Sequence, residues 1–412
     1  MSHVHIIGAG LAGLSAAVEA VQLGHSVSVY EGAAQAGGRC RSYEDSHLGQ
    51  IIDNGNHLVL SGNTSVKRYC DAISADGFHI VETARFPFCD IKSGARWAID
   101  INEGRFPSWV FSAGRRAPGT TALDYLPGLK MLFADQRAVI ADLLDQASPA
   151  YTQFWEPLIL AVLNTPLDQA AASLMRPVFT ETLMKGGVHC RPMIAHHSLA
   201  EALIDPALAY LKSYGAQVHF GCRVAGLIVD GAVTAISLPG DTRTLGIGDS
   251  VVVAVPSWQA QKLVPDVNPP GAGEGILNIH YAFQSGVKEP EFLGLVSSLT
   301  QWVFVRPDMA SVTVSAAGRA LAEQPDVLAA RCWAEIAGAY GWAAEPLPPY
   351  RVIKEKRATF DQSPDGLKRR SGPETSIPNL FLAGDWTATG LPATIEGAIR
   401  SGARAVAALS AP

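Results

Sequence analysis

The sequence has no surplus of basic residues and, at 17%, few charged residues of any kind. Lysine and arginine number 32 against 38 acidic residues, which gives a net charge of −6. Nucleic-acid binding needs a basic face that neutralises phosphates, so we expect no nucleic-acid partner. Because 48% of the 412 residues are hydrophobic, a large core can form and apolar surface can remain for a ligand.

Cysteine is also scarce: the chain has six, far apart, and no Cys-x-x-Cys pair. This spacing argues against a disulfide scaffold and against the local ligand pairs usual at zinc sites. His196 and His197 are adjacent, as are His189 and Cys190, but adjacent side chains point apart on a helix or a strand. We therefore expect reduced thiols, as in cytoplasmic proteins, and no metal site.

Long apolar runs are absent as well. No stretch of about 20 apolar residues occurs, so no membrane-spanning helix is predicted. The N-terminal segment is apolar, but it lacks the basic region that opens a signal peptide. We expect a cytoplasmic protein that is soluble or that lies on a surface.

What the sequence does contain is an alternation of strands and helices at its beginning. Residues 4–7 are a β-branched run that ends in glycine, residues 11–23 are typical of a helix, and residues 26–30 indicate a second strand. Together they make one βαβ unit. Helical stretches broken by prolines are predicted from 63 to 210, and strands return between 218 and 255.

The remaining sequence predicts antiparallel strands between 276 and 314, a helix at 321–340 and a strand at 351–359. A last strand and a last helix are predicted at 380–383 and 395–409. This order indicates a nucleotide-binding fold that a second domain interrupts twice, with end-pieces from both ends of the chain.

A Gly-x-Gly-x-x-Gly run directly follows the first predicted strand and opens the first predicted helix. In this context the run is typical of dinucleotide binding. Gly8 makes the tight turn, Gly10 lets the backbone approach a pyrophosphate, and Gly13 allows close packing of helix on strand. The helix start, at Leu11 and Ala12, offers free N–H groups and partial positive charge to the phosphates.

Two further features follow this turn. Glu31 ends the second predicted strand about 20 residues on, where an acid suits a ribose diol and repels a 2′-phosphate. Gly38 and Arg39 lie in the segment 37–41, which has two glycines and two arginines. We interpret it as a second phosphate-contacting loop, since an arginine fork can hold phosphate oxygens; the alternative is a basic surface turn.

Near the other end, the predicted strand at 380–383 continues into Gly384 and Asp385. Asp385 is placed to accept hydrogen bonds from the hydroxyl groups of a ribityl chain. Pro392, Ala393 and Thr394 are expected to open the last helix, with the proline in its first turn. N–H groups there would face the pyrimidine edge of an isoalloxazine and stabilise the negative charge of a reduced flavin. FAD is therefore the predicted cofactor.

These segments together resemble the FAD-dependent superfamily of amine oxidases and phytoene desaturases. The stretch 218–256 is similar to the third cofactor segment of that superfamily, which implies that Val224 lies against the adenine. More narrowly, the chain resembles the bacterial hydroxysqualene dehydroxylases, the squalene-associated flavoproteins of hopanoid biosynthesis. This similarity spans nearly the whole length, with Ser108 where a second aromatic residue is expected. The segments that carry it are 53–57 (Asp-Asn-Gly-Asn-His), 107–109, 115–119, 163–166 and 384–398.

The fold expected from the pattern and from the resemblance is α/β. It has a Rossmann-like FAD-binding domain, a parallel sheet with helices on both faces, interrupted by an α+β substrate-binding domain. We assign residues 1–62, 211–275 and 356–412 to the FAD-binding domain. Residues 63–210 and 276–355 are assigned to the substrate-binding domain.

The resemblance implies that hydroxysqualene is reduced to squalene with loss of water, with hydride from reduced flavin. Hydroxide is a poor leaving group, so an acid should protonate it, and the allylic cation needs shielding from water. The segment with Gly55 and Asn56 should run beside the flavin, which makes Asp53 and His57 the candidates for the acid or for a positioning group. A structural role is the alternative for His57.

Trp302 and Phe304 are candidates for the substrate pocket, because aromatic faces stabilise cations. Ordinary core packing is the alternative for both. They lie among the strands predicted between 276 and 314, on the substrate side of the expected fold.

A squalene-like substrate dissolves in the bilayer, and one segment suits contact with it. Residues 106–111 are rich in aromatic side chains, and Arg115, Arg116 and Lys130 follow. Aromatic and basic residues together are typical of an interfacial patch on anionic lipid; a buried helix start with a solvated basic turn is the alternative. Peripheral attachment to the cytoplasmic face of the bacterial inner membrane is our hypothesis, with upstream enzymes resembling squalene or phytoene synthases as partners.

Other functions stay open at this point. A phytoene- or carotenoid-type desaturase would use the same cofactor to remove hydride. A flavin-binding scaffold of a membrane terpenoid pathway would catalyse nothing. Amine oxidation fits the superfamily, but the sequence has no sign of an amine site. No second glycine fingerprint indicates a nicotinamide, so the sequence does not identify an electron donor.

Overall fold

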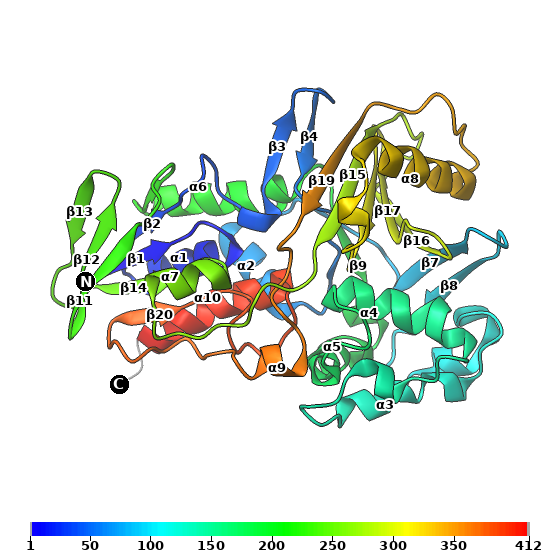
Figure 1. The fold of residues 1–412 in the computed structure, drawn as a ribbon, viewed down its shortest axis with the longest axis horizontal. Coiled ribbons are helices and arrows are strands. Elements are labelled where there is room, and N and C mark those ends of the chain that lie inside the picture. The colour runs from blue at the N-terminus through cyan, green and yellow to red at the C-terminus, as the bar shows by residue number, and fades with distance from the viewer. Residues whose placement is uncertain (1, 410–412) are drawn as a thin grey trace.

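The computed structural model describes residues 2–409 and shows an elongated molecule (Figure 1). A five-stranded parallel sheet lies at the end near the N-terminus, and a seven-stranded mixed sheet with a helical layer lies at the other end. The strands of the parallel sheet come from three separate stretches of the chain. We keep the division into two domains, with the boundaries given above, as a proposal.

The parallel sheet has the order β10-β2-β1-β14-β20, and each neighbouring pair is parallel. The three central strands β2, β1 and β14 are short runs rich in β-branched residues and buried on both faces, as parallel strands usually are. Ile6 and Val252 point into one core, and Ile7 and Val253 point into another. The predicted α/β class with a Rossmann-like sheet is confirmed. The strands are β10 (Gln217–His219), β2 (Ser26–Tyr30), β1 (His3–Ile7), β14 (Ser250–Val253) and β20 (Leu380–Leu382).

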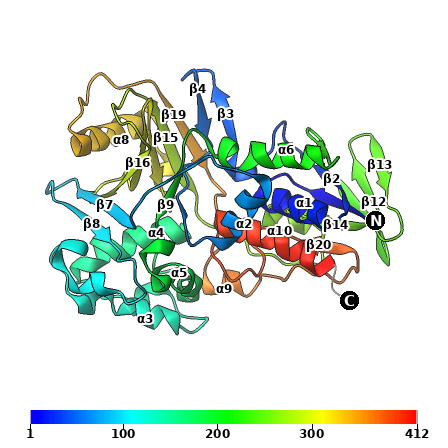
Figure 2. The same cartoon turned by 180° about the vertical axis from the view of Figure 1, so that it is seen from behind.

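Helices cover one face of this sheet, and Figure 2 shows them in front of it. They are α1 (Leu11–Gln22), α2 (Thr64–Ile73), α6 (Asp205–Ser213) and α10 (Ile395–Leu409). The other face packs against a short helix and a three-stranded antiparallel sheet. These are α7 (Ser257–Leu263), β11 (Gly226–Asp230), β12 (Ala232–Leu238) and β13 (Asp241–Thr244).

The first and last helices, α1 and α10, lie side by side (Figure 2). Their close approach depends on Gly402, because a Cβ atom there would collide with the backbone of Ala12. Ser15 adds a cross-link by donating to the carbonyl of Ile399 at 2.9 Å. This packing brings the two ends of the chain to the same side of the parallel sheet.

The large sheet has the order β19-β15-β18-β17-β16-β7-β8. Its strands pair antiparallel, as predicted for 276–314, except that β16 and β7 are parallel. One face packs on α8 (Pro325–Tyr340), which buries Trp333. The strands are β19 (Tyr350–Glu355), β15 (Ile276–Ala282), β18 (Met309–Val314), β17 (Trp302–Arg306), β16 (Glu291–Val296), β7 (Arg85–Asp90) and β8 (Arg96–Asp100).

The prediction of helices alone between 63 and 210 is wrong, because this stretch also contributes β6, β7, β8 and β9. In β7, Phe86 and Phe88 face the helical layer while Cys89 faces α8, a two-residue alternation that indicates a strand. Pro87 concealed that pattern. The smaller sheets contain β3 (Ser42–Asp45) with β4 (Gln50–Asp53), and β5 (Val59–Leu60), β9 (Pro192–Ala195) and β6 (Phe78–Ile80).

The remaining helical elements of the described chain are short helices and single turns, and those between residues 108 and 189 form the helical layer beside the large sheet. None of the helices formed by residues 2–409 has the length and apolar character that crossing a membrane requires. The short helices are α3 (Pro127–Leu132), α4 (Glu156–Leu163), α5 (Met175–Glu181) and α9 (Pro364–Leu367). The helical turns are η1 (Gly38–Cys40), η2 (Ser108–Phe111), η3 (Ala113–Arg115), η4 (Ala122–Tyr125), η5 (Ile140–Leu143), η6 (Tyr151–Trp155), η7 (Ala172–Leu174), η8 (Leu183–Lys185), η9 (Gly187–His189), η10 (Ala200–Ile204) and η11 (Ala320–Ala322).

Candidate functional site

The glycine turn between β1 and α1 is built for close approach of backbone to backbone. Gly8 has a φ of +108°, and its amide donates to the carbonyl of Tyr30 at 2.8 Å. A side chain at Gly13 would collide with the Gly8 carbonyl, so only glycine permits this packing. At Gly10, by contrast, a Cβ atom would meet nothing within 4 Å. The backbone at Gly10 therefore borders open space.

The first turn of α1 presents unpaired amides beside that space. Gly10 is the N-cap residue and has no side chain to cap the helix. In the part of the chain that the structure describes, the amides of Leu11, Ala12 and Gly13 donate to no protein acceptor. Free N–H groups and the helix dipole give such an end a partial positive charge. The turn therefore has the geometry of a phosphate site.

Glu31 follows β2, where the sequence predicts an acid for a ribose diol. Its carboxylate accepts hydrogen bonds from the amides of Ala9 (2.8 Å) and Ala33 (2.7 Å). These bonds brace the glycine turn, a role that the sequence did not indicate. The Cys222 amide donates to the Glu31 carbonyl at 2.8 Å, and Val224 is buried two residues further on. The contacts of Glu31 with ribose and of Val224 with adenine stay predictions.

The segment 37–41 lies against the same glycine turn. Gly10 and Gly37 form a β-bridge, and the Gly37 amide donates to the carbonyl of Ala9 at 2.8 Å. A Cβ atom on Gly38 would stand 3.3 Å from the Cα of Gly10, so bulk at this position would crowd the turn.

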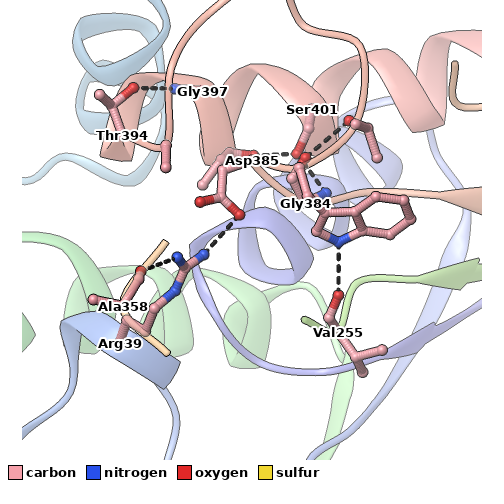
Figure 3. Close-up of polar contacts among 12 residues, drawn as sticks. Arg39, Val255, Ala358, Gly384, Asp385, Thr394, Gly397 and Ser401 are labelled. Atoms are coloured by element: carbon pink, nitrogen blue, oxygen red, sulfur yellow. Dashed lines mark hydrogen bonds and ion pairs between the residues drawn. The ribbon is translucent and has the colours of Figure 1, made fainter. Parts of the chain in front are cut away.

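Arg39 joins this N-terminal loop to the C-terminal part of the chain (Figure 3). Its guanidinium lies 2.6 Å from a carboxylate oxygen of Asp385 and donates to the carbonyl of Ala358 at 2.6 Å. Burial alone would lower the pKa of Arg39, but the Asp385 carboxylate outweighs it and raises that pKa, so Arg39 keeps its charge. The structure thus brings the two predicted halves of the site together. A phosphate contact of Arg39 stays a prediction.

The chain around Asp385 is held by backbone and side-chain contacts that Figure 3 displays in part. Gly384 has a φ of +142°, and its amide donates to Ser401 of α10 at 2.8 Å. The indole of Trp386 donates to the carbonyl of Val255 at 2.9 Å. The loop that carries Asp385 is therefore tied both to the last helix and to the segment after β14.

Arg370 is a functional candidate that the sequence did not reveal. Its buried guanidinium donates to the carbonyls of Asp385 (2.9 Å) and Leu391 (2.9 Å), to the Thr387 carbonyl, and to Thr389 Oγ1 (3.0 Å). Burial lowers the pKa of Arg370 to about 10. One side chain thus fixes the course of the loop from 385 to 391. No local pattern marks it, because its partners lie at least 15 residues away.

The start of α10 differs from the prediction in detail. The Thr394 hydroxyl accepts from the Gly397 amide at 3.1 Å, which makes Thr394 the N-cap residue. Pro392 precedes this cap by two residues, so its predicted place in the first turn is wrong. The amide of Ala393 donates to Gln362 Oε1 at 2.8 Å and is not free for a ligand. Whether these residues contact a flavin is still a prediction.

Glu396, in the first turn of α10, also caps a second helix. Its buried carboxylate accepts from the amides of Ser65 (2.9 Å) and Val66 (2.9 Å) at the start of α2. Arg400 pairs with Glu396 at 2.8 Å and with Glu181 at 2.6 Å. These contacts fix α10 against both α2 and α5.

Asp53 is fully buried at the end of β4 and is saturated with partners. Its carboxylate accepts from Ser42 Oγ (2.6 Å) and from the Leu199 amide (2.9 Å), and it pairs with Arg306 at 3.2 Å. These three donors hold both carboxylate oxygens in place. Of the two predicted roles, acid and positioning group, these contacts favour positioning.

The segment after Asp53 runs from the N-terminal loop to the large sheet. The Asn54 amide donates to the Arg41 carbonyl at 2.9 Å, and Asn56 Nδ2 donates to Thr313 Oγ1 at 3.1 Å. A Cβ atom on Gly55 would come too close to a side chain of β15. Gly55 and Asn56 therefore lie between the N-terminal loop at Arg41 and the large sheet; their contact with a cofactor stays a prediction.

One ring nitrogen of His57 makes a hydrogen bond within the protein, and the other can accept one from a ligand. Nδ1 lies 2.9 Å from the carbonyl of Gly55, and because a carbonyl only accepts, Nδ1 must carry the proton. Burial lowers the pKa of His57 below its ordinary value, so the ring is neutral at pH 7. Nε2 then carries a lone pair and can accept a hydrogen bond.

Trp302 and Phe304 belong to an aromatic cluster on the face of the large sheet toward the helical layer. The ring of Trp302 is 5.4 Å from that of Phe88 and 6.0 Å from that of Phe292, and the Phe304 ring is 6.4 Å from Phe292. Both side chains are more than nine-tenths buried. They have the packing expected of core residues, and their role in a substrate pocket stays a prediction.

Comparison with known proteins identifies the family of this chain. The family model for flavin-containing amine oxidoreductases matches residues 11–410, and the chain belongs to that family. Within it, the chain is 43% identical over 404 residues to the hydroxysqualene dehydroxylase of Zymomonas mobilis, covering 98% of this chain and 97% of that one. The protein of the same name from Rhodopseudomonas palustris is 42% identical with the same coverage. Putrescine oxidase shares the fold, with a TM-score of 0.72, 15% identity and 98% of each chain covered.

The cofactor of this flavin oxidoreductase is FAD. The residues present fit that group, because the open space at Gly10 and the unpaired amides of α1 suit a pyrophosphate, and Glu31 suits a ribose. Asp385 would hold the ribityl hydroxyls, with Arg39 fixing the carboxylate from behind. The second helix start, at Thr394, would lie toward the far end of the same cofactor.

We expect the substitution Asp385→Ala to weaken FAD binding by about tenfold to a hundredfold, because a hydrogen bond to a charged group contributes about 1.5–3 kcal/mol. Titration of the apoprotein with FAD, followed by the quenching of flavin fluorescence, measures the effect. Asp365→Ala is the matched control, since Asp365 is 81% exposed and pairs with Lys368 on the surface. Equal affinity in the two variants would contradict the assignment of Asp385.

Proposed function

We propose that this protein catalyses the FAD-dependent reduction of hydroxysqualene to squalene with loss of water. The observation that carries the proposal is the similarity to the hydroxysqualene dehydroxylase of Zymomonas mobilis over 98% of the chain. The convergence of the glycine turn, Arg39 and Asp385 supports it, because this is the arrangement that a bound FAD needs.

When bound and reduced, FAD supplies the hydride that replaces the hydroxyl group. The protein must then keep water away from the carbon that becomes cationic. The buried aromatic cluster on the large sheet supports this requirement: Trp302, Phe304, Phe292 and Phe88 pack together as an apolar group whose ring faces are negative. We propose that the isoprenoid chain lies toward this cluster.

His57 is proposed as the residue that orients the hydroxyl group. Its Nδ1–H is committed to the Gly55 carbonyl, so the neutral ring presents Nε2 as an acceptor. The substrate hydroxyl can donate to Nε2, which turns an oxygen lone pair toward the group that protonates it. Asp53 acts through its contacts, because it anchors the segment that carries His57 to Arg306 of β17.

An exposed apolar surface on the helical layer is where we expect the protein to meet its substrate. We call it the apolar ridge. On α3 and the turn before it, Leu126, Leu129 and Phe133 follow the spacing of one helix face and are 47%, 55% and 84% exposed. The opposite face is buried through Met131 and Leu132. The full ridge consists of Phe106, Phe111, Leu123, Leu126, Leu129 and Phe133, all exposed.

Isolated exposed apolar residues are common, but a group of six on neighbouring segments marks an interaction site. Of the two predicted alternatives for 106–111, the exposed and stacked rings of Phe106 and Phe111 support the interfacial patch, whereas the burial of Trp109 and Val110 supports the buried helix start. Lys130 is exposed beside the ridge, whereas Arg115 pairs with Asp100 at 2.8 Å. We propose that the ridge dips into the bilayer surface in which squalene-like molecules dissolve.

The catalytic proposal predicts that reduced enzyme is reoxidised by its substrate. When photoreduced, FAD-loaded protein is mixed with hydroxysqualene without oxygen, we expect the absorbance of oxidised flavin to return and squalene to form in equal amount. Mass spectrometry of the extracted lipid measures the product. Reaction of only the oxidised enzyme, with a phytoene-like polyene, would favour a desaturase instead. No colour change with either substrate would leave a non-catalytic scaffold.

The role of His57 predicts a loss that a similar acceptor repairs. His57→Phe should slow the single turnover by about tenfold to a hundredfold, which is the cost expected of a misplaced reacting group. His57→Gln should recover much of the rate because its amide oxygen can accept the same hydrogen bond. The wild-type rate should fall as acidic pH protonates His57; a rate that rises with acid would instead make His57 the proton donor.

The membrane proposal predicts that the ridge controls lipid binding. The wild-type protein should float with vesicles of phosphatidylethanolamine and phosphatidylglycerol, and Leu126→Ser with Phe133→Ser should reduce the bound fraction at least tenfold. Burial of each such side chain contributes about 1.5–3 kcal/mol. Leu23→Ser with Val327→Ser is the control, because both residues are more than half exposed away from the ridge. Wild-type protein that stays in the soluble fraction would refute the proposal.

A further inference from the structure

Two histidines that are far apart in the sequence share one face of a small sheet. In the antiparallel pair of β6 and β9, His79 stands opposite Ile194, and His196 follows Ile194 by two residues. Side chains two residues apart on a strand point to the same face. The His196 amide donates to the Gly77 carbonyl at 2.9 Å and so continues the ladder. The two rings lie 5.6 Å apart and nearly perpendicular, at 75°.

A carboxylate from another part of the fold completes this cluster. Glu289 lies in the loop between β15 and β16 of the large sheet, and its Oε2 is 3.5 Å from His79 Nδ1. One nitrogen of each histidine and one oxygen of Glu289 lie within 4.8 Å of one another. Three segments of the chain, separated by more than 90 residues each, therefore direct one donor atom each to a single point.

Direct hydrogen bonds do not join the members of this cluster. The distance of 3.5 Å between His79 and Glu289 is longer than a normal hydrogen bond. Within residues 2–409, the ring of His196 has no hydrogen-bond partner. We propose that His79, His196 and Glu289 bind a divalent transition-metal ion of the zinc class, at a site separate from the cofactor.

The nitrogen and oxygen atoms of these three side chains favour an ion of the zinc class. Two imidazoles and a carboxylate are typical ligands of Zn²⁺, whereas Ca²⁺ and Mg²⁺ prefer oxygen donors. In a tetrahedral zinc site the donor atoms are about 3.3 Å apart, so the cluster must contract slightly on binding. The Glu289 side chain is 65% exposed and has the freedom to make that movement. A water molecule would complete four ligands.

The proposed ion would act as a brace. Phe78 and Ala195, on the opposite face of the small sheet, pack into the core beneath the parallel sheet. Glu289 belongs to the large sheet through β16. A metal ion held by all three ligands would therefore link the small sheet to the large sheet, and its loss would loosen their relative position without removing a group from the FAD site.

Zinc titration of the FAD-loaded protein, after treatment with a chelator, tests the site. We expect calorimetry to give one tight Zn²⁺ per chain, and Co²⁺ to give the visible absorption of a four-coordinate ion. The double variant His79→Ala with His196→Ala should lose this binding, and Glu289→Gln should weaken it by about tenfold or more. Unchanged flavin absorbance in the variants shows that the fold is intact.

His197→Ala is the matched control, because His197 is the exposed neighbour of His196 and lies outside the cluster. It should retain full affinity for Zn²⁺. Binding of equal strength in the double variant would place the ion at other histidines and overturn the proposal, as would wild-type protein that takes up no Zn²⁺ at micromolar concentration.

Discussion

The ion pair between Arg39 and Asp385 is the contact on which the site depends. It joins residues 346 positions apart in the chain, at 2.6 Å, beside the glycine turn that opens α1. If Asp385 holds a ribityl chain, as proposed, a carboxylate fixed before the ligand arrives spares binding the cost of ordering it. Arg39 orders Asp385 from one side, and Arg370 orders the following loop from the other. The surrounding packing of α1 on α10 holds both ends in register.

Other buried charged groups in this part of the molecule are also held by several partners. Buried carboxylates and guanidinium groups do not stand alone; Asp53, Glu396 and Arg370 each have several partners from distant segments. Burying a charge without such partners would cost several kcal/mol. The polar contacts therefore contribute to specificity: they select one relative placement of β4, α2, α10 and the loop after β20.

The sequence was most informative where function imposes a local pattern. The tight turn at Gly8 and the close packing at Gly13 were predicted because backbone approach requires glycine at fixed spacings, and the α/β class followed from the strands around them. The ligand contacts of Glu31 and Asp385 stay predictions. Arg370, Gln362 and the small sheet with His79 and His196 were not predicted, because their partners lie in distant segments. Pro87 concealed a strand, and Thr394 rather than Pro392 opens the last helix. Tertiary packing determines such details, and the hydrophobic periodicity of the sequence does not reveal how distant segments pack.

The order of strands in the parallel sheet has a consequence for how the protein is made. The strand β1 at its centre is among the first segments synthesised, but β20 and α10, which complete the pocket, are among the last. Until residues 380–409 emerge from the ribosome, the nascent chain exposes one edge of β14 and the apolar side of α1. The packing of α10 on α1 therefore forms only late in synthesis, and a chaperone that shields this unfinished surface would act during the interval.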